Sequence, residues 1–240
     1  MWGGPTPVPE AIGKCNSVLE RADGDRKAMS TAMFVMAKLE AMRGRFDEAR
    51  QLIDRAHAIL EEVAIPVWLS GPLTQMHGWV EVLAGEPVEA EPSLRRGVEV
   101  LREIGELSWL STVAAILAEA LYAQGREEDA DEFVRISEEA AGSEDAYSQG
   151  LVRSIRAKIL ARRGELDAAV DLARDAVAIL EPTDFLFLQG FSRLSLGEVL
   201  LAAGRTDEAR AALGEAEALC GAKGFSVGVA RARELLARLG

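Results

Sequence analysis

The chain has 240 residues, of which 49% are hydrophobic, so it holds enough apolar material for a sizeable core and is not intrinsically disordered. It carries 27 Lys and Arg residues against 39 Asp and Glu residues, a formal net charge of −12, which argues against direct binding to nucleic acid or to an anionic membrane. Aromatic residues make up only 5%, and β-branched residues are sparse, so the composition favours helices over strands.

The N-terminal residues, MWGGPTPVPE, have neither the basic region nor the apolar region of a signal peptide. Their prolines and glycines predict a flexible tail over residues 1–9. Residues 10–21 follow with the pattern of a single helix, which ends at the sequence ADGD. Because no linker interrupts the sequence after residue 9, residues 10–240 are predicted to form one continuous domain.

A short phrase then returns five times at intervals of 39 to 41 residues. The five copies are GRFDEA from Gly44, GEPVEA from Gly85, GREEDA from Gly125, GELDAA from Gly164 and GRTDEA from Gly204. Small residues stand at three fixed distances from each glycine, namely seven before it, five after it and twelve after it. They are Ala37, Ala49, Ala56, Gly78, Ala90, Gly97, Ala118, Ala130, Ser137, Ala157, Ala169, Ala176, Gly197, Ala209 and Ala216.

This pattern predicts pairs of helices joined by a tight turn. The glycine supplies the left-handed backbone of the turn, and the small residues let the two helices approach closely. Acidic residues directly after the glycine, such as Asp47 and Glu48, complement the dipole at the start of the second helix. Larger apolar residues at helical spacing fill the remaining inner faces.

The phrase and its three small positions resemble the tetratricopeptide repeat. That resemblance implies an all-α, right-handed α-α superhelix, a solenoid of about five helix-turn-helix repeats. We place the repeats at about 25–64, 65–105, 106–142, 143–182 and 183–222, followed by a capping helix at 225–239. The period of about 40 residues exceeds the usual 34, and the proline of the family consensus is displaced, as at Pro182, so we expect lengthened helices.

Four longer phrases are similar to the C-terminal repeat region of actinobacterial adenylate/guanylate cyclases that also carry a signal-transduction ATPase domain. They are QMHGWVEVLAGEPVEAEPSLRRGVEVL, GELSWLSTVAAILAEALYAQGREEDA, SQGLVRSIRAKILARRGELDAAVDLARDAV and TDFLFLQGFSRLSLGEVLLAAGRTDEA. The similarity spans most of residues 25–240. It implies a regulatory arm of a larger signalling or transcription-regulating protein, in which the repeats dock a partner or restrain an upstream ATPase domain.

Catalytic chemistry has little support in the sequence. The chain contains no P-loop, no dinucleotide-binding glycine motif, no H-E-x-x-H and no G-x-S-x-G. Its two histidines, His57 and His77, lack metal-ligand spacing and are interpreted as structural. Cys15 and Cys220 stand far apart, which predicts reduced thiols and a cytoplasmic protein. We therefore expect a non-enzymatic protein without metal or cofactor. The sequence gives no basis for predicting the oligomeric state.

Two further stretches have unusual composition. Residues 63–80 are uncharged over a membrane-spanning length, but Pro66, Gly71 and Pro72 argue against a membrane span. The Pro-interrupted residues 65–75 and the apolar residues 185–188 predict either packing between repeats or an exposed docking patch. The carboxylates between Glu127 and Asp145 are interpreted as a solvated outer face, with docking of a basic partner as the alternative.

The first helices of the repeats are expected to line a concave groove. Counted from the turn glycines, the residues expected to project into it are Lys38, Gln75, Trp79, Glu119, Tyr122, Ser154, Lys158, Arg162 and Glu198, together with Phe34 and Leu194. Trp79 and Tyr122 are either partner-binding anchors or inter-repeat packing, whereas Lys158 and Arg162 are expected to be exposed.

The groove suggests two functions. The first is the binding of a protein or peptide segment by a regulatory module, and the alternative is the sensing of a small molecule near Trp79, Glu119 and Tyr122.

Overall fold

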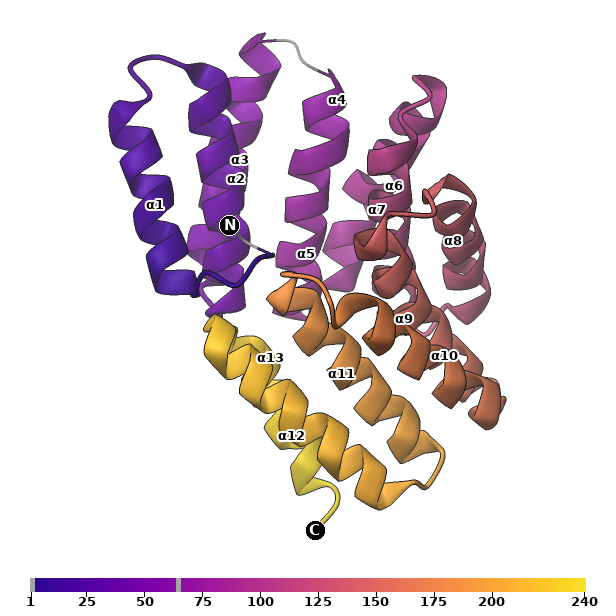
Figure 1. Ribbon diagram of the computed structural model, residues 1–240. Helices are drawn as coiled ribbons and strands as arrows, with labels where there is room; N and C mark the ends of the chain where they lie inside the picture. The colour runs from indigo at the N-terminus through magenta and orange to yellow at the C-terminus, as the bar shows by residue number, and fades with distance from the viewer. Residues whose placement is uncertain (1–2, 64–65) are drawn as a thin grey trace.

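The computed structural model describes residues 3–63 and 66–240, and every regular element in these two ranges is a helix (Figure 1). The predicted all-α solenoid is confirmed. The elements in chain order are α1 (Val8–Arg21), α2 (Arg26–Met42), α3 (Phe46–Val63), α4 (Pro66–Trp68), the π-helix η1 (Leu69–Leu73), α5 (Thr74–Ala84), α6 (Pro87–Glu103), α7 (Leu107–Ala123), α8 (Glu127–Ala140), α9 (Ala146–Arg162), α10 (Leu166–Leu180), α11 (Leu186–Ala202), α12 (Thr206–Lys223) and α13 (Ser226–Ala237).

The helices pair in sequence. Helix α2 packs against α3, α5 against α6, α7 against α8, α9 against α10, and α11 against α12. Helix α1 precedes the first pair and α13 follows the last. The predicted boundary between the first two repeats, at 64 and 65, lies outside the described residues.

The turns and helix crossings explain the repeated phrase. All five turn glycines have φ between +70° and +82°, a conformation that residues with a Cβ rarely adopt. The fifteen small residues are all buried. At one crossing, a Cβ on Gly78 would lie 2.7 Å from Leu94 Cδ2 and 3.0 Å from Ile116 Cγ2, so these helices touch only because Gly78 has no side chain.

The second repeat departs from the regular pattern at its first helix. Pro72 lies inside η1, where its missing N–H interrupts α-helical bonding, and the backbone widens to a π-turn. The Thr74 hydroxyl donates a hydrogen bond to the Leu69 carbonyl (2.8 Å) across this turn. Leu73 and Gln75 are buried, so this part of the proline-interrupted stretch packs inside the molecule, while Ile65 lies outside the described residues. No described helix combines the length and apolarity needed to cross a bilayer.

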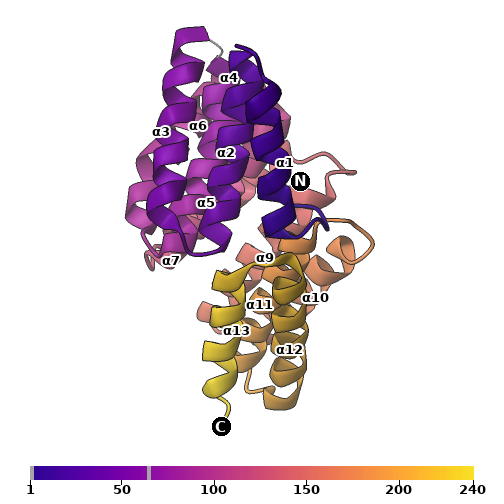
Figure 2. The same cartoon turned by 90° about the vertical axis from the view of Figure 1, so that its left-hand side faces the viewer.

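The solenoid curves until its two ends meet. The inner helices α2, α5, α7, α9, α11 and α13 contact one another in this order, and α13 returns to contact α2. Figure 2 shows α13 below α2 and α5. A Cβ on Gly44, in the first turn, would lie 3.8 Å from Val227 Cγ2 in α13. The concave side is therefore narrow, and side chains from distant repeats meet across it.

Aromatic rings fill the centre of this curve. Trp79 in α5 meets Phe187 and Phe191 in α11 edge-on, with ring centroids 5.1 and 5.4 Å apart. The Lys38 ammonium lies 3.8 Å from the centroid of a Trp79 ring and 4.0 Å from that of Phe187. Phe187 and Leu188 are fully buried, so this half of the apolar 185–188 stretch forms inter-repeat packing and not an exposed docking patch.

The predicted flexible tail is wrong for its described part, residues 3–9. Helix α1 already begins at Val8, and residues 3–7 run along the ends of α11 and α12 (Figure 1). The Gly3 carbonyl accepts a hydrogen bond from the Phe187 backbone N–H (3.2 Å). Met1 and Trp2 lie outside the described residues. The prolines and glycines that suggested flexibility instead form a bent segment without helix, which is held by these contacts.

Candidate functional site

A cavity of about 480–490 Å³ opens at each of two places in the solenoid, and one of them lies on the concave side. This concave pocket, of about 490 Å³, is lined by the inner helices α5, α7, α9, α11 and α13. Six of the nine residues predicted to project into the groove line it: Trp79, Glu119, Tyr122, Lys158, Arg162 and Glu198. Leu194 lines it as well.

Three of the predicted groove residues do not reach the pocket. Lys38, Gln75 and Ser154 are buried in the packing between inner helices. Gln75 Nε2 donates to the Tyr147 hydroxyl (3.1 Å), and the Ser154 hydroxyl donates to the Gly150 carbonyl of its own helix (2.8 Å). Helical spacing correctly places them on the inner face, but the tight curvature converts that part of the groove into core. Phe34 is also buried, in a cluster with Met33 and Leu60.

The predicted exposure of Lys158 is wrong. Its side chain is only 5% exposed, and its ammonium donates to both oxygens of Glu119 at 2.6 and 2.7 Å. Burial alone would lower the pKa of Lys158, but the Glu119 carboxylate, helped by Glu198, outweighs burial and raises that pKa above its usual value. Lys158 is therefore a charged group that fixes the pocket wall by pairing α9 with α7.

Arg162 is exposed as predicted, and it is held in place. Its guanidinium donates to the Tyr122 carbonyl and to Glu127, each at 2.9 Å, and lies 3.7 Å from the centroid of the Tyr122 ring. Tyr122 is half-buried beneath it, and burial raises the pKa of this phenol. Tyr122 thus supports a cation at the rim of the pocket.

Sequence reasoning missed Arg231, which faces Arg162 from α13. Arg231 donates to Glu198 Oε1 at 2.8 Å and also lines the pocket. The sequence assigned residues 225–239 to a capping helix, and only the return of α13 towards α2 brings its arginine to the concave side. No motif marks this arginine in the sequence.

The concave pocket combines an apolar floor with a rim of paired charges. Its floor consists of the half-buried ring of Phe191 together with the buried rings of Trp79 and Phe225. Its charged lining consists of three cations, Lys158, Arg162 and Arg231, and two carboxylates, Glu119 and Glu198. Arg162 also pairs with Glu127 and Arg231 with Glu234, so the rim has no excess of positive charge. Because both arginines remain partly exposed, such a pocket can accept an apolar side chain next to an acidic group that competes for them.

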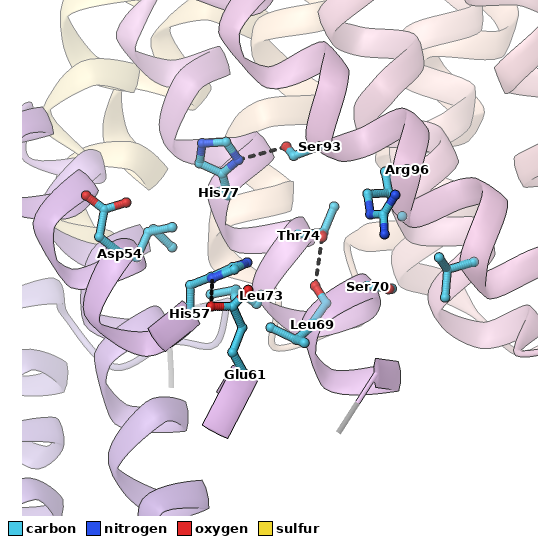
Figure 3. A pocket seen from close by; sticks show the side chains of 13 residues that line it. Asp54, His57, Glu61, Leu69, Ser70, Leu73, Thr74, His77, Ser93 and Arg96 are labelled. Carbon is cyan, nitrogen blue, oxygen red and sulfur yellow. Dashed lines mark hydrogen bonds and ion pairs between the residues drawn. The ribbon is translucent and has the colours of Figure 1, made fainter. Parts of the chain in front are cut away.

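The second cavity, of about 480 Å³, lies between α3, η1, α5 and α6 (Figure 3). It brings together both histidines of the chain, His57 and His77, which stand 20 residues apart in the sequence. His77 Nδ1 lies 2.8 Å from the Ser93 hydroxyl, and His57 Nδ1 lies 3.5 Å from Glu61. Burial lowers the pKa of His77, so its imidazole is neutral at pH 7.

This second cavity owes its place to the irregular first helix of its repeat. Leu69, Ser70 and Leu73 of η1 form part of its wall, and Pro72 was its one sequence signal. Among the described residues, no group of three or more His, Cys, Asp or Glu side chains is arranged to hold a metal ion.

The carboxylates of the acidic stretch lie on the outer helix α8 and at its end, and none of them is buried. Arginines of α9 and of the turn after it neutralise several of them. Arg156 pairs with Glu138 at 2.5 Å and Arg163 with Asp131 at 3.3 Å. This arrangement matches the predicted outer face, and it uses the charges to join neighbouring repeats.

The family model described as "Tetratricopeptide repeat" matches the chain over residues 31–62, 112–135, 150–175 and 190–219. Each matched segment lies within one helix pair, in the order α2–α3, α7–α8, α9–α10 and α11–α12. No curated protein matches the sequence significantly.

Solved structures with a similar fold are more distant in sequence. BtubC (BKLC) from P. vanneervenii is 18% identical with a TM-score of 0.62, over 90% of this chain and 92% of that one. Nearly identical TPR-like repeats of a putative kinesin light chain from Podosopora anserina are 20% identical with a TM-score of 0.52, over 78% of this chain and 93% of that one. A variant of the same repeats with one substitution gives a TM-score of 0.53 at the same identity. At these identities the likeness concerns the fold.

Proposed function

We propose that the chain is a non-catalytic interaction and regulatory module that binds a partner segment in its concave pocket, because four of its segments match the tetratricopeptide repeat, which generally mediates protein–protein interactions. The observation that carries the proposal is the pocket itself. Five inner helices, drawn from four repeats and the terminal helix α13, place an apolar floor beside two partly exposed arginines. Such convergence of distant repeats on one cavity is typical of a recognition site.

The pocket favours a particular partner chemistry. Val82, Phe191 and Val227 are half-buried in the lining and offer an apolar surface to one inserted side chain of the partner. Arg162 and Arg231 keep 38% and 43% of their side chains exposed, so their guanidinium groups can reach an incoming carboxylate. We therefore propose that the partner segment carries an aromatic or large aliphatic residue next to Asp, Glu or a C-terminal carboxylate.

The resemblance of the four long phrases to cyclase–ATPase proteins supports a more specific context. In this proposal the chain is the C-terminal arm of a cytoplasmic signalling or transcription-regulating protein, and the bound segment belongs to an upstream ATPase domain. The coding sequence that precedes the chain in the same reading frame is the direct check. An ATPase domain encoded there supports this context, whereas an unrelated upstream sequence contradicts it without affecting the pocket.

The pocket is tested by selecting peptides from a random displayed library against the chain. We expect enrichment of sequences with an acidic residue beside an apolar one. The charge-reversal variant Arg162→Glu with Arg231→Glu should weaken their binding by about tenfold or more, because hydrogen bonds to charged groups contribute about 1.5–3 kcal/mol each. Lys158 is unsuitable for this test, since reversing its charge beside Glu119 would leave two carboxylates buried together.

The matched control is Arg102→Glu with Arg135→Glu, which makes the same charge change at exposed positions of the outer helices α6 and α8. Both double variants should give the far-UV circular dichroism spectrum of the parent chain. Equal binding by the parent chain and the Arg162/Arg231 variant would remove the concave pocket from the proposal.

The volume of the concave pocket also favours the alternative, a domain that senses a small molecule, because about 490 Å³ lies within the range of small-ligand sites. Thermal shifts with a metabolite library separate the two functions. A compound that raises the melting temperature of the parent chain but not that of the Arg162/Arg231 variant supports the alternative.

A further inference from the structure

Residues 3–7 lie on the helical body as a non-helical segment that bends at residues 3–6. Burial varies along it: Gly3 and Val8 are buried, Gly4 and Thr6 half-buried, and Pro5 and Pro7 exposed. Pro7, directly before α1, has φ −58° and ψ 147°, which is the polyproline II conformation. The segment thus presents one side to the protein and its prolines to solvent, in the way that a bound peptide lies on a binding surface.

The surface under this segment binds main-chain carbonyl groups of residues 3–7. The ammonium group of Lys223, at the end of α12, donates to the Gly4 carbonyl and to the Thr6 carbonyl, both at 2.7 Å. The Lys223 side chain is fully buried. The carbonyl of Gly3 accepts from the Phe187 N–H in the first turn of α11, where a helix leaves its N–H groups without intrahelical partners. Three successive contacts therefore fix the direction and the register of the segment.

Side chains of the segment contribute little to this recognition. A Cβ on Gly3 would come no closer than 3.8 Å to Phe185, and one on Gly4 no closer than 3.8 Å to the Asp184 carbonyl, so there is room for side chains. Val8 is the single apolar anchor, fully buried against Gly224, whose own φ is +79°.

We propose that the surface formed by the start of α11 and the end of α12, at Phe187, Lys223 and Gly224, is a second peptide-binding site. In the free protein its ligand is the chain's own segment 3–7, bound in cis. The class of ligand that it can take in trans is an uncharged, proline-containing peptide that adopts the same bent backbone, with an apolar residue after the second proline. None of these three residues lines the concave pocket, so the test of this site is independent of the test of the proposed function.

Lys223 is suited to this role by its charge. Burial lowers its pKa to about 8, so the ammonium form still predominates at pH 7 and makes charge-assisted hydrogen bonds to the two carbonyls. A partner that competes for the site would release the segment and, with it, a link between α1 and the last helix pair. Binding at this site would therefore loosen the closure of the solenoid.

Hydrogen exchange on the full chain tests the cis contact. We expect the amide of Phe187 to exchange about a hundredfold more slowly than in an unstructured peptide, since it is hydrogen-bonded and covered by the segment. The variant Lys223→Met should accelerate it by about tenfold or more. The control Lys14→Met, at an exposed lysine of α1, should leave it unchanged. Exchange of Phe187 in the parent chain at the unstructured rate would overturn the proposal.

A labelled peptide, GGPTPVPE, tests the site in trans. The full-chain variant Thr6→Arg places a second cation beside Lys223, so its own segment should leave and its Phe187 amide should lose protection. Fluorescence anisotropy should then show binding of the peptide to the Thr6→Arg chain, but not to the chain that also carries Lys223→Met.

The control peptide carries the same Thr6→Arg change and should not bind. Either of two results would refute the site: full protection of Phe187 in the Thr6→Arg chain, or no binding of GGPTPVPE once that protection is lost. Both measurements use only the chain and its own peptide, so a failure here says nothing against the concave pocket.

Discussion

At the scale of single residues, the fold is unusual because it buries most of its lysines. Three of the five, Lys38, Lys158 and Lys223, are buried. Each side-chain nitrogen meets a different kind of group. Lys38 lies between the rings of Trp79 and Phe187, Lys158 is paired with a carboxylate, and Lys223 binds main-chain carbonyls. Burial holds the pKa of Lys38 well below its usual value, whereas Glu119 reverses the effect of burial at Lys158.

The buried ion pair gives the prediction at this scale. Lys158→Met should lower the free energy of unfolding by about 3–5 kcal/mol, because it leaves the Glu119 carboxylate buried without its cation. Adding Glu119→Leu should recover most of the loss, since a well-packed apolar pair can replace a buried ion pair. Urea denaturation measures both variants. Arg162→Met, at an exposed ion pair, is the control and should cost less than about 1 kcal/mol. A double variant no more stable than Lys158→Met would contradict this account.

At the scale of elements, glycine has two separate tasks in the helix pairs. At the turns it provides a positive φ, as at Gly164 with φ +82°. At the crossings it provides space, as at Gly78 against Leu94. The same residue type thus appears in the repeated phrase and in the small positions for different physical reasons, conformational in the first case and steric in the second.

Substitution by alanine distinguishes these tasks. Gly164→Ala should lower the free energy of unfolding by about 1 kcal/mol, because alanine is strained at positive φ although the surrounding space is open. Gly78→Ala should cost about 1–3 kcal/mol through overpacking. Gly214→Ala, at an exposed helical site with open space around it, should instead stabilise the chain by about 0.5–1 kcal/mol. Equal effects at all three sites, measured by thermal and urea denaturation, would refute the distinction.

At the scale of the whole molecule, the closed curvature changes how a repeat protein is held together. In an open solenoid each repeat contacts only its neighbours, so stability is a sum of local terms. Here Phe187 in the fifth helix pair contacts Lys38 in the first and Trp79 in the second. Residues 3–7 add a further link between the two ends. The ends of the chain therefore stabilise each other directly.

The prediction at this scale concerns the spread of a local change. Phe187→Ala should cost about 3–5 kcal/mol, and hydrogen exchange should accelerate in α2 as well as in α11. Leu200→Ala removes a similarly buried side chain from the same helix, within a cluster shared with Ala209 and Ala212. It should destabilise α11 and α12 without a selective effect on α2. If both variants affect α2 equally, the contact across the solenoid has no special role.

The sequence by itself determined the repeat, its turns and its helix crossings. These features are local. Each depends on contacts within one repeat of about 40 residues, and each requires a particular residue type, such as a turn glycine or a small residue, at a fixed position of that repeat. The inner face of the first helices was predicted for the same reason, and six of its nine named residues line the concave pocket.

Only the tertiary structure decided which of those residues remain accessible. The curvature of the solenoid is the sum of small rotations between successive repeats, and no single residue in the sequence indicates that sum. That sum buries Lys38, Gln75 and Ser154, pairs Lys158 with Glu119, and brings Arg231 to the rim. It also places Lys223 under residues 3–7, more than 200 positions away in the chain. Local chemistry therefore specified the units, whereas the way they close on one another decided where the pocket and the second peptide site lie.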